Sequence, residues 1–387
     1  MKWTKENEER LKELALAKTI PEIALELKLD EWVVRNKLSR LKVKPVKKEL
    51  KAKEPTIETV RADISKRVQK SNELQLSKQV KLLSEELVKT EKERDTLLGV
   101  GGVETYTIKP SGKESEKSEA TTISLASDWH IEEEVKSSQV NGLNKFDINI
   151  AKERAEKFFK VTAQLIKVHQ KEYEINTHIL ALLGDFISGS IHDDLKEGNK
   201  IQPTEAIWEA QKLIASGIEY LLKNTDVKLI IPCSAGNHSR ITEKQRIQTE
   251  YGNSLEILMY RQMEKYFASE DRVKFIINDS YLTYVKVYDF VCRFSHGHAL
   301  KYGGGIGGIF IPAFKAISQW NKSKNADWDF FGHFHQLKDG GNFVSNGSLI
   351  GFNSFAVRIK ADYEKPKQAF IIIDKERGMD VVRKITL

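Results

Sequence analysis

Five short motifs, each directly after an apolar run with the character of a strand, constrain the fold of this 387-residue chain more than any other feature. In chain order they are Asp128-Trp129-His130, Gly184-Asp185, Gly236-Asn237-His238, His296-Gly297-His298 and Gly332-His333-Phe334-His335. They contain six of the nine histidines. A fold that accommodates this pattern has to present several strand ends at one place.

Strand-like and helix-like runs alternate from residue 121 onward. Helices are predicted over 150–171, 204–223, 249–268 and 311–322, between ten short apolar strands. The first half alternates strand and helix as βαβ units do, and the second half is rich in strands and contains a hairpin turn at 339–342. This pattern predicts an α/β (α+β) fold in which two stacked sheets have helices on their outer faces.

The motifs carry side chains that bind divalent metals. Asp128 and His130 are two residues apart, so in an extended segment they point the same way and can chelate one ion. His333 and His335 repeat that spacing. Asp185 follows a nearly all-apolar strand, and its two carboxylate oxygens can bridge two cations. Imidazole together with carboxylate suits manganese, iron, zinc or nickel better than calcium.

The five motifs together resemble those of the calcineurin-like metallophosphoesterase superfamily, over about residues 121–360. The resemblance implies a four-layer αββα sandwich of two mixed sheets and two divalent metal ions, with manganese preferred. One ion would take Asp128, His130, Asp185 and His335, and the other Asp185, Asn237, His296 and His333. Asp185 would bridge them together with a water or hydroxide. The resemblance also implies that His238 faces the leaving group of a phosphoester.

Three further residues are candidates for substrate contact or for support of the ligands. His298 is two residues beyond His296 and could face the same way. His192 lies seven residues past Asp185, but repair nucleases of this superfamily carry a catalytic histidine closer to that aspartate, and here the third residue on is Ser188. Arg240 follows Asn237-His238 and could bind a substrate phosphate, although an ordinary surface arginine fits the sequence as well.

Residues 4–42 predict three short helices in a helix-turn-helix arrangement. Thr4 can cap the first helix, Pro21 suits the first turn of the second, and residues 28–30 form a tight connection to the third. The third helix carries Arg35, Asn36, Lys37 and Arg40, the residue types that contact DNA from a major groove. The segment resembles helix-turn-helix domains of the sigma-factor and Myb-like kind. A three-helix bundle for protein contacts is the alternative.

The chain is therefore divided into residues 1–44 as a DNA-binding-like domain, 45–58 as a linker, 59–98 as a long helix, 99–120 as a second linker and 121–387 as the metallophosphoesterase domain. The long helix partly fits a heptad pattern, so a short coiled coil that joins copies of the chain is preferred to a surface helix. Residues 1–120 carry 27 Lys and Arg against 22 Asp and Glu, so most of the net charge of +7 lies there.

These features favour a dinuclear-metal-dependent phosphoester hydrolase that acts on DNA as a nuclease or phosphodiesterase. The arrangement resembles phage- or prophage-encoded proteins. A phosphatase or phosphodiesterase for a small nucleotide or a protein is one alternative, and a DNA-binding regulator with a non-catalytic metal site is another. The sequence has no apolar run long enough for a membrane span. Its two cysteines lie in apolar strands, so a reducing cytoplasm is expected.

Overall fold

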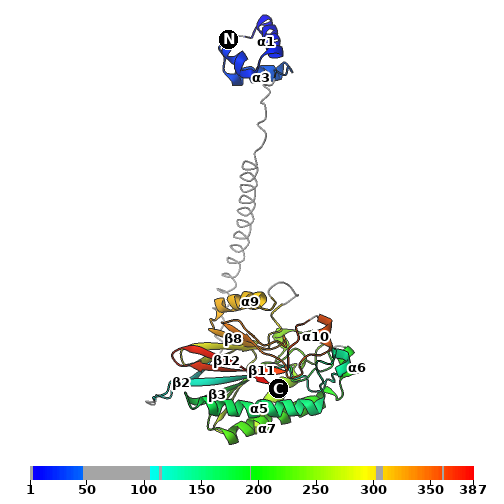
Figure 1. Cartoon of the computed structure of the whole chain (residues 1–387), viewed down its shortest axis with the longest axis vertical. Coiled ribbons are helices and arrows are strands. Elements are labelled where there is room, and N and C mark those ends of the chain that lie inside the picture. Colours follow the sequence, from blue (N-terminus) through cyan, green and yellow to red (C-terminus); the bar gives the residue numbers. More distant parts are fainter. Residues whose placement is uncertain (1–2, 47–104, 113–115, 192, 302–307, 360) are drawn as a thin grey trace. The chain divides into compact units, whose positions relative to one another are not determined.

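The computed structural model describes residues 3–46, 105–112, 116–191, 193–301, 308–359 and 361–387 (Figure 1). These residues belong to two compact units, one N-terminal and one that contains all the strands. The predicted coiled coil at 59–98 and His192 lie outside the described residues. Among the helices of the described ranges, none combines the length and the apolar composition that a membrane crossing needs.

The described residues of the N-terminal unit form three helices around a small apolar core. They are α1 (Lys5–Ala17), α2 (Ile20–Leu27) and α3 (Glu31–Arg40). The Thr4 hydroxyl accepts from the Asn7 amide at the start of α1, and the Asp30 carboxylate accepts from the Trp32 amide at the start of α3. These caps satisfy amide groups that the first helical turn leaves without partners. The side chains of Leu11, Ala15, Ile23, Ala24, Val34 and Leu38 form the buried core.

One six-stranded sheet of the larger unit contains the first three motif strands. Its order is β12-β11-β2-β3-β4-β5. The strands are β2 (Glu119–Ala126), β3 (Glu174–Leu182), β4 (Lys228–Pro232), β5 (Val273–Ile276), β11 (Lys367–Asp374) and β12 (Gly378–Thr386). From β2 to β5 the neighbours are parallel, whereas β11 is antiparallel to both β2 and β12. The carboxyl ends of β2, β3 and β4 therefore meet at one edge.

The other six-stranded sheet contains the last two motif strands. Its order is β1-β6-β7-β8-β10-β9. The strands are β1 (Thr105–Ile108), β6 (Thr283–Val287), β7 (Phe290–Ser295), β8 (Trp328–Phe331), β9 (Lys338–Asp339) and β10 (Phe343–Ser345). β7 and β8 are parallel neighbours, so His296 and the 333–335 motif leave the sheet side by side.

The two sheets stack face to face, with helices on both outer faces (Figure 1). Side chains alternate along β3, where Ile179 and Ala181 enter the core between the sheets and Leu180 and Leu182 enter the core under the helices. The helices are α5 (Ile148–His169), α7 (Pro203–Asn224) and α8 (Leu255–Tyr266) on the first sheet, and α9 (Phe310–Ser323) on the second. The prediction of two mixed sheets with flanking helices is confirmed.

The remaining elements are short and connect the layers. They are η1 (Ser137–Val140), α6 (Asp193–Gly198), η2 (Ile247–Thr249) and α10 (Ser354–Ile359).

Two details differ from the sequence-based expectation. The predicted linker 99–120 contains β1, which pairs in parallel with β6, and the start of β2. The predicted helix 249–268 begins only at Leu255, because Ser254 caps it by accepting from the Ile257 amide.

Candidate metal centre

The seven predicted ligands come from the carboxyl ends of five strands in the two sheets. Asp128 and His130 follow β2, Asp185 follows β3 and Asn237 follows β4, whereas His296 follows β7 and the histidine pair 333/335 follows β8. Parallel strands deliver their carboxyl ends to one edge of a sheet, which is where α/β folds place ligands. Stacking the two sheets brings the two edges together.

The ligands gather in two clusters of potential metal-binding atoms. One consists of Asp128, His130 and His335, and the other of Asp185, His296 and His333. Within each cluster the donor atoms all lie within 4.8 Å of one another. The Asn237 amide oxygen is 3.1 Å from His296 Nε2, which places it with the second cluster. The bridging role of Asp185 stays a prediction.

The spacing between donor atoms fits a shared cation. Atoms that each bind an ion at about 2.1 Å, with angles of about 90–110°, lie about 3.0–3.4 Å apart. In the first cluster His130 Nε2 is 3.2 Å from His335 Nε2, which is 3.4 Å from Asp128 Oδ1. In the second, His296 Nε2 is 2.9 Å from Asp185 Oδ2. The residues present therefore fit two divalent ions.

The backbone at these positions adopts a conformation that side chains other than glycine rarely take. Nine non-glycine residues among those described have a positive φ, and five of them are predicted ligands: Asp128, His130, Asp185, His333 and His335. Their φ values lie between 47° and 72°. Left-handed backbone at a residue with a side chain is costly and is concentrated at functional sites. The turns after β2, β3 and β8 are therefore strained, and their backbone conformation orients the ligand side chains.

The glycines of two motifs allow two loops to touch. A Cβ at Gly184 would lie 2.2 Å from the Gly236 nitrogen, and a Cβ at Gly236 would lie 2.1 Å from Asp185 Oδ1. No side chain fits at either position. The Gly-Asp and Gly-Asn-His sequences are therefore the contact between the loop after β3 and the loop after β4.

The carboxylates give the second cluster a strong attraction for positive charge. Burial alone lowers the pKa of His296, but the Asp185 carboxylate outweighs it and raises that pKa to about 10. Burial and the charge of His296 lower the pKa of His333 to about 3, so its imidazole is neutral. Neutral imidazole and carboxylate are the forms that bind metal ions.

A second layer of hydrogen bonds fixes the orientation of the histidine rings. His296 Nδ1 lies 2.6 Å from the Leu183 carbonyl oxygen, and His130 Nδ1 lies 2.8 Å from the Ser188 hydroxyl. The Ser188 hydroxyl in turn donates to Glu133. Ligand histidines commonly donate their other ring N–H in this way, which directs Nε2 toward the ion. Ser188 thus supports His130 at the position where a catalytic histidine was considered.

Two buried carboxyl groups that the sequence analysis did not single out hold the loops in place. Glu256, the second residue of α8, accepts from the Phe186 amide and the Gly236 amide, both at 2.7 Å. Glu132 accepts from the Ser188 and Gly189 amides, both at 2.8 Å. Burial raises the pKa of Glu256 to about 7 and that of Glu132 to about 8. Their partners are distant in sequence, so no local motif reveals them.

His238 stands beside the first cluster. Its ring centroid is 4.9 Å from that of His130, and its Nδ1 lies 3.0 Å from the Ser188 carbonyl oxygen. Because a carbonyl only accepts, Nδ1 carries the proton in the neutral ring. The backbone amide of His238 donates to Asp185 Oδ1 at 2.9 Å. The same residue thus positions a ligand and presents an imidazole next to the metal ligands.

The other candidates have structural contacts. His298 is buried, with Nε2 3.2 Å from Glu250 Oε1 and its ring 5.5 Å from that of His296. Burial and the charge of His296 lower the pKa of His298 to about 2, and burial raises that of Glu250 to about 8. Arg240 donates to the carbonyl oxygens of Asn237, Thr242 and Glu243, so it organises the loop after β4.

No family model matches the sequence. No curated protein matches it either. Among solved structures, a dimetal phosphatase from Danio rerio matches with a TM-score of 0.33 and 8% identity, over 69% of this chain and 98% of that one. Vps29 from Chaetomium thermophilum matches with a TM-score of 0.24 and 10% identity, over 68% and 95%.

A hypothetical protein from Pyrococcus horikoshii matches with a TM-score of 0.30 and 15% identity, over 69% of this chain and 88% of that one. Two stacked mixed sheets with flanking helices, and two clusters of metal-binding side chains at the shared strand ends, define an α/β sandwich with candidate dimetal sites.

Proposed function

We propose that this chain is a dinuclear-metal-dependent phosphoester hydrolase of the calcineurin-like kind. The observation that carries the proposal is the pair of adjacent clusters, whose donor atoms have the spacing of metal ligands. Two bound divalent ions lower the pKa of a shared water and neutralise phosphate oxygens. The resemblance of all five motifs to that superfamily supports the same conclusion.

The chain's own residues supply orientation and proton transfer. Hydrogen bonds from the ring Nδ1 atoms to the Ser188 hydroxyl and the Leu183 carbonyl oxygen fix the rings of His130 and His296 before any ligand binds. The neutral His238 ring carries its proton on Nδ1. Its Nε2 is therefore the atom that can hold or deliver a proton at the leaving group. Such a group contributes about 100-fold to 10,000-fold in rate.

A comparison of His238→Ala with the parent tests this role. Hydrolysis of bis(p-nitrophenyl) phosphate with manganese is the measurement, and the expected result is a kcat lower by about 100-fold or more with unchanged metal content. His169→Ala is the matched control, since His169 is a buried histidine on α5 whose ring packs near Phe370. Equal kcat values for the His238 variant and the parent would exclude the proposed role.

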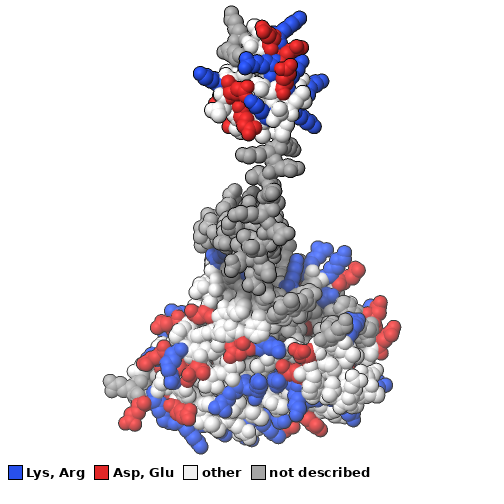
Figure 2. All heavy atoms as spheres, turned by 45° about the horizontal axis from the view of Figure 1, so that its top comes forward, with Lys and Arg blue, Asp and Glu red and all other residues white. Residues whose placement is uncertain are grey.

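We propose further that the substrate is DNA, which the N-terminal unit binds. Support comes from the exposed face of α3, where Trp32, Arg35, Asn36, Ser39 and Arg40 follow the i, i+3, i+4, i+7, i+8 spacing of one helical face. The visible surface of this unit carries both basic and acidic side chains (Figure 2), so the exposed face of α3 is a local feature. Arginine and asparagine are the residues that most often read guanine and adenine edges.

Lys37, also predicted to bind DNA, has a different environment. It forms an ion pair with Glu8 of α1, and its ammonium lies 5.2 Å from the centroid of the Trp3 ring. These contacts join α1 to α3, so Lys37 stabilises the unit. The residues proposed to contact DNA are therefore Arg35, Asn36 and Arg40.

Nuclease activity is tested with labelled single-stranded and double-stranded DNA in the presence of manganese. The parent is expected to cleave DNA, and Asp185→Asn is expected not to. A preparation that hydrolyses bis(p-nitrophenyl) phosphate but no DNA would contradict the assignment of substrate while leaving the phosphoesterase assignment intact.

A further inference from the structure

The turn after β7 carries His296 and packs against the turn after β8. Gly297 is buried and has a φ of 112°, a conformation that residues other than glycine rarely adopt. A Cβ there would lie 3.0 Å from the Gly332 carbonyl oxygen and 3.4 Å from His333 Cβ. The Gly332 amide donates to the His296 carbonyl oxygen at 2.8 Å. The backbone of these two turns therefore sets the relative positions of the His296 and His333 imidazoles.

One phenol oxygen holds the first of these turns. Tyr281 lies in the loop between β5 and β6, and its hydroxyl oxygen accepts from the amides of Gly297 and Ala299, both at 3.1 Å. Backbone amides that converge on one point form the kind of concavity in which proteins also bind anions. A buried amide without a partner is costly, so the phenol oxygen stabilises this one conformation of the turn.

The ring of Tyr281 is held by other side chains. Its centroid lies 4.8 Å from that of His298 in an edge-to-face contact, and 6.3 Å from that of Trp320 on α9. The His298 side chain is only 2% exposed, and its Nε2 is 3.2 Å from Glu250 Oε1. These contacts keep the Tyr281 hydroxyl at the turn after β7.

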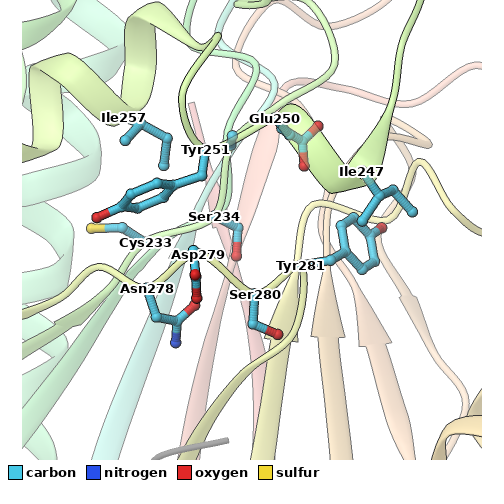
Figure 3. A pocket seen from close by; sticks show the side chains of 11 residues that line it. Cys233, Ser234, Ile247, Glu250, Tyr251, Ile257, Asn278, Asp279, Ser280 and Tyr281 are labelled. Carbon is cyan, nitrogen blue, oxygen red and sulfur yellow. The ribbon is translucent and has the colours of Figure 1, made fainter.

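A buried side chain separates Tyr281 from the metal clusters. Tyr281 and Glu250 line a cavity of about 20 Å³ (Figure 3), which has the room of one water molecule. The His298 side chain stands between this cavity and the ligands, with its ring centroid 5.5 Å from that of His296. Tyr281 therefore acts on the metal centre through the turn that carries His296, and not by contact with a substrate.

We propose that Tyr281 is a positioning residue for the ion of the second cluster. By fixing the turn 296–299, its hydroxyl keeps the His296 imidazole where it can share one ion with Asp185 and His333. This role rests on the proposed two-metal function and deepens it, because the affinity of the second cluster then depends on a hydroxyl that contacts neither metal nor substrate. Groups that orient metal ligands in this way contribute about 10-fold to 100-fold in metal affinity.

The variant Tyr281→Phe removes the oxygen and keeps the ring. Equilibrium dialysis of the metal-free protein against manganese gives the number of bound ions and their dissociation constants. The parent is expected to bind two ions, and the variant is expected to bind one with the parent's affinity and the other about 10-fold to 100-fold more weakly. With two equivalents of manganese, the electron paramagnetic resonance spectrum should show interacting pairs in the parent and mainly single ions in the variant.

Tyr288→Phe is the matched control. Tyr288 follows β6 and packs in the core between the sheets. Its hydroxyl oxygen accepts from the Thr121 hydroxyl near the start of β2, at the opposite end of that strand from Asp128. The control is expected to bind both ions as the parent does. Equal losses of manganese affinity in the two variants, or an equal loss for both ions in Tyr281→Phe, would show a general structural role and overturn the proposal.

Activity gives a second readout. At limiting manganese, Tyr281→Phe should hydrolyse bis(p-nitrophenyl) phosphate more slowly than the parent, and excess manganese should restore kcat without a change in KM. A KM that stays raised at saturating manganese would mean that Tyr281 contacts the substrate, and would contradict a role in positioning.

Amide hydrogen exchange of the metal-free parent tests the same contact without a variant, which decides the matter if Tyr281→Phe does not fold. The amides of Gly297 and Ala299 are expected to be protected, and exchange at the rate of unstructured amides would overturn the proposal. A parent that binds fewer than two manganese ions would reject the two-metal function and the positioning role with it. A parent and a variant that both bind two ions with equal affinity would reject the role of Tyr281 alone.

Discussion

At the scale of single residues, the site depends on side chains that are oriented by an energetically unfavourable backbone conformation. Five predicted ligands have positive φ, and Gly184 and Gly236 leave no space for a side chain. The motifs at the strand ends predicted these residues because the residues of each motif are close together in the sequence. Glu132, Ser188 and Glu256 were not predicted as supports, since each acts on amides or rings that are distant in sequence.

Gly236→Ala tests the loop contact. The added Cβ would lie 2.1 Å from Asp185 Oδ1 and 2.2 Å from the Asp185 nitrogen, so the two loops must separate. A displacement of about 1 Å in such a site costs about 100-fold in rate, and we expect a loss of that size together with weaker metal binding. Gly252→Ala is the control, because its Cβ meets nothing within 4 Å. Activity measurements that place both variants at the parent level would refute the close contact.

At the scale of secondary-structure elements, the strands were predicted more accurately than the helix starts. Lys228–Pro232 and Trp328–Phe331 have the predicted bounds, since buried strands are continuous apolar runs between turn residues. β1 was missed because four residues among polar neighbours become a strand only by pairing with β6, which is distant in the chain. The helix α8 starts late because the Ser254 cap competes with the helical pattern before it.

The pairing of β2 with β3 predicts a pH dependence of stability. His178 of β3 is buried between the hydroxyls of Thr122 and Ser124, at 2.8 and 2.7 Å, and burial lowers its pKa to about 3. Between about pH 3 and 6.5 the unfolded chain therefore binds a proton there that the folded chain does not. Stability rises with pH across that window, by up to about 1.4 kcal/mol per pH unit for one proton.

Urea unfolding of the metal-free protein at pH 5 and pH 6.5 measures this contribution. His178→Gln is expected to be less stable than the parent at pH 6.5 and to lose less stability on acidification. Parallel slopes for the two proteins would show that His178 is not the group responsible.

At the scale of the whole molecule, the chain joins a helical unit, in which α3 exposes Arg35, Asn36 and Arg40, to a unit with two metal clusters. In the proposed function the second unit carries out the reaction and the first unit binds the substrate. Prediction of the two stacked sheets succeeded because alternation of strands and helices is a property of the whole sequence. The predicted self-association through residues 59–98 lies outside the described residues and stays a prediction.

Replacing Arg35 and Arg40 by alanine tests whether α3 binds DNA independently of catalysis in the other unit. We expect the double variant to bind DNA at least about 10-fold more weakly and to discriminate less between DNA sequences, because each lost base contact is worth about 1–3 kcal/mol. Hydrolysis of bis(p-nitrophenyl) phosphate should not change. Lys5→Ala/Lys12→Ala removes equal charge from α1 and is the control. Equal DNA binding by both double variants would mean that α3 does not read DNA.

We expect the ends of the five strands to hold two divalent metals that hydrolyse phosphoesters. The most direct test measures metal content and bis(p-nitrophenyl) phosphate hydrolysis on the same preparations of the parent and of Asp185→Asn. We expect two manganese ions per parent chain, activity that chelation abolishes and manganese restores, and loss of activity in the variant. Full activity after chelation, or no more than background metal in a folded parent supplied with manganese, would contradict it.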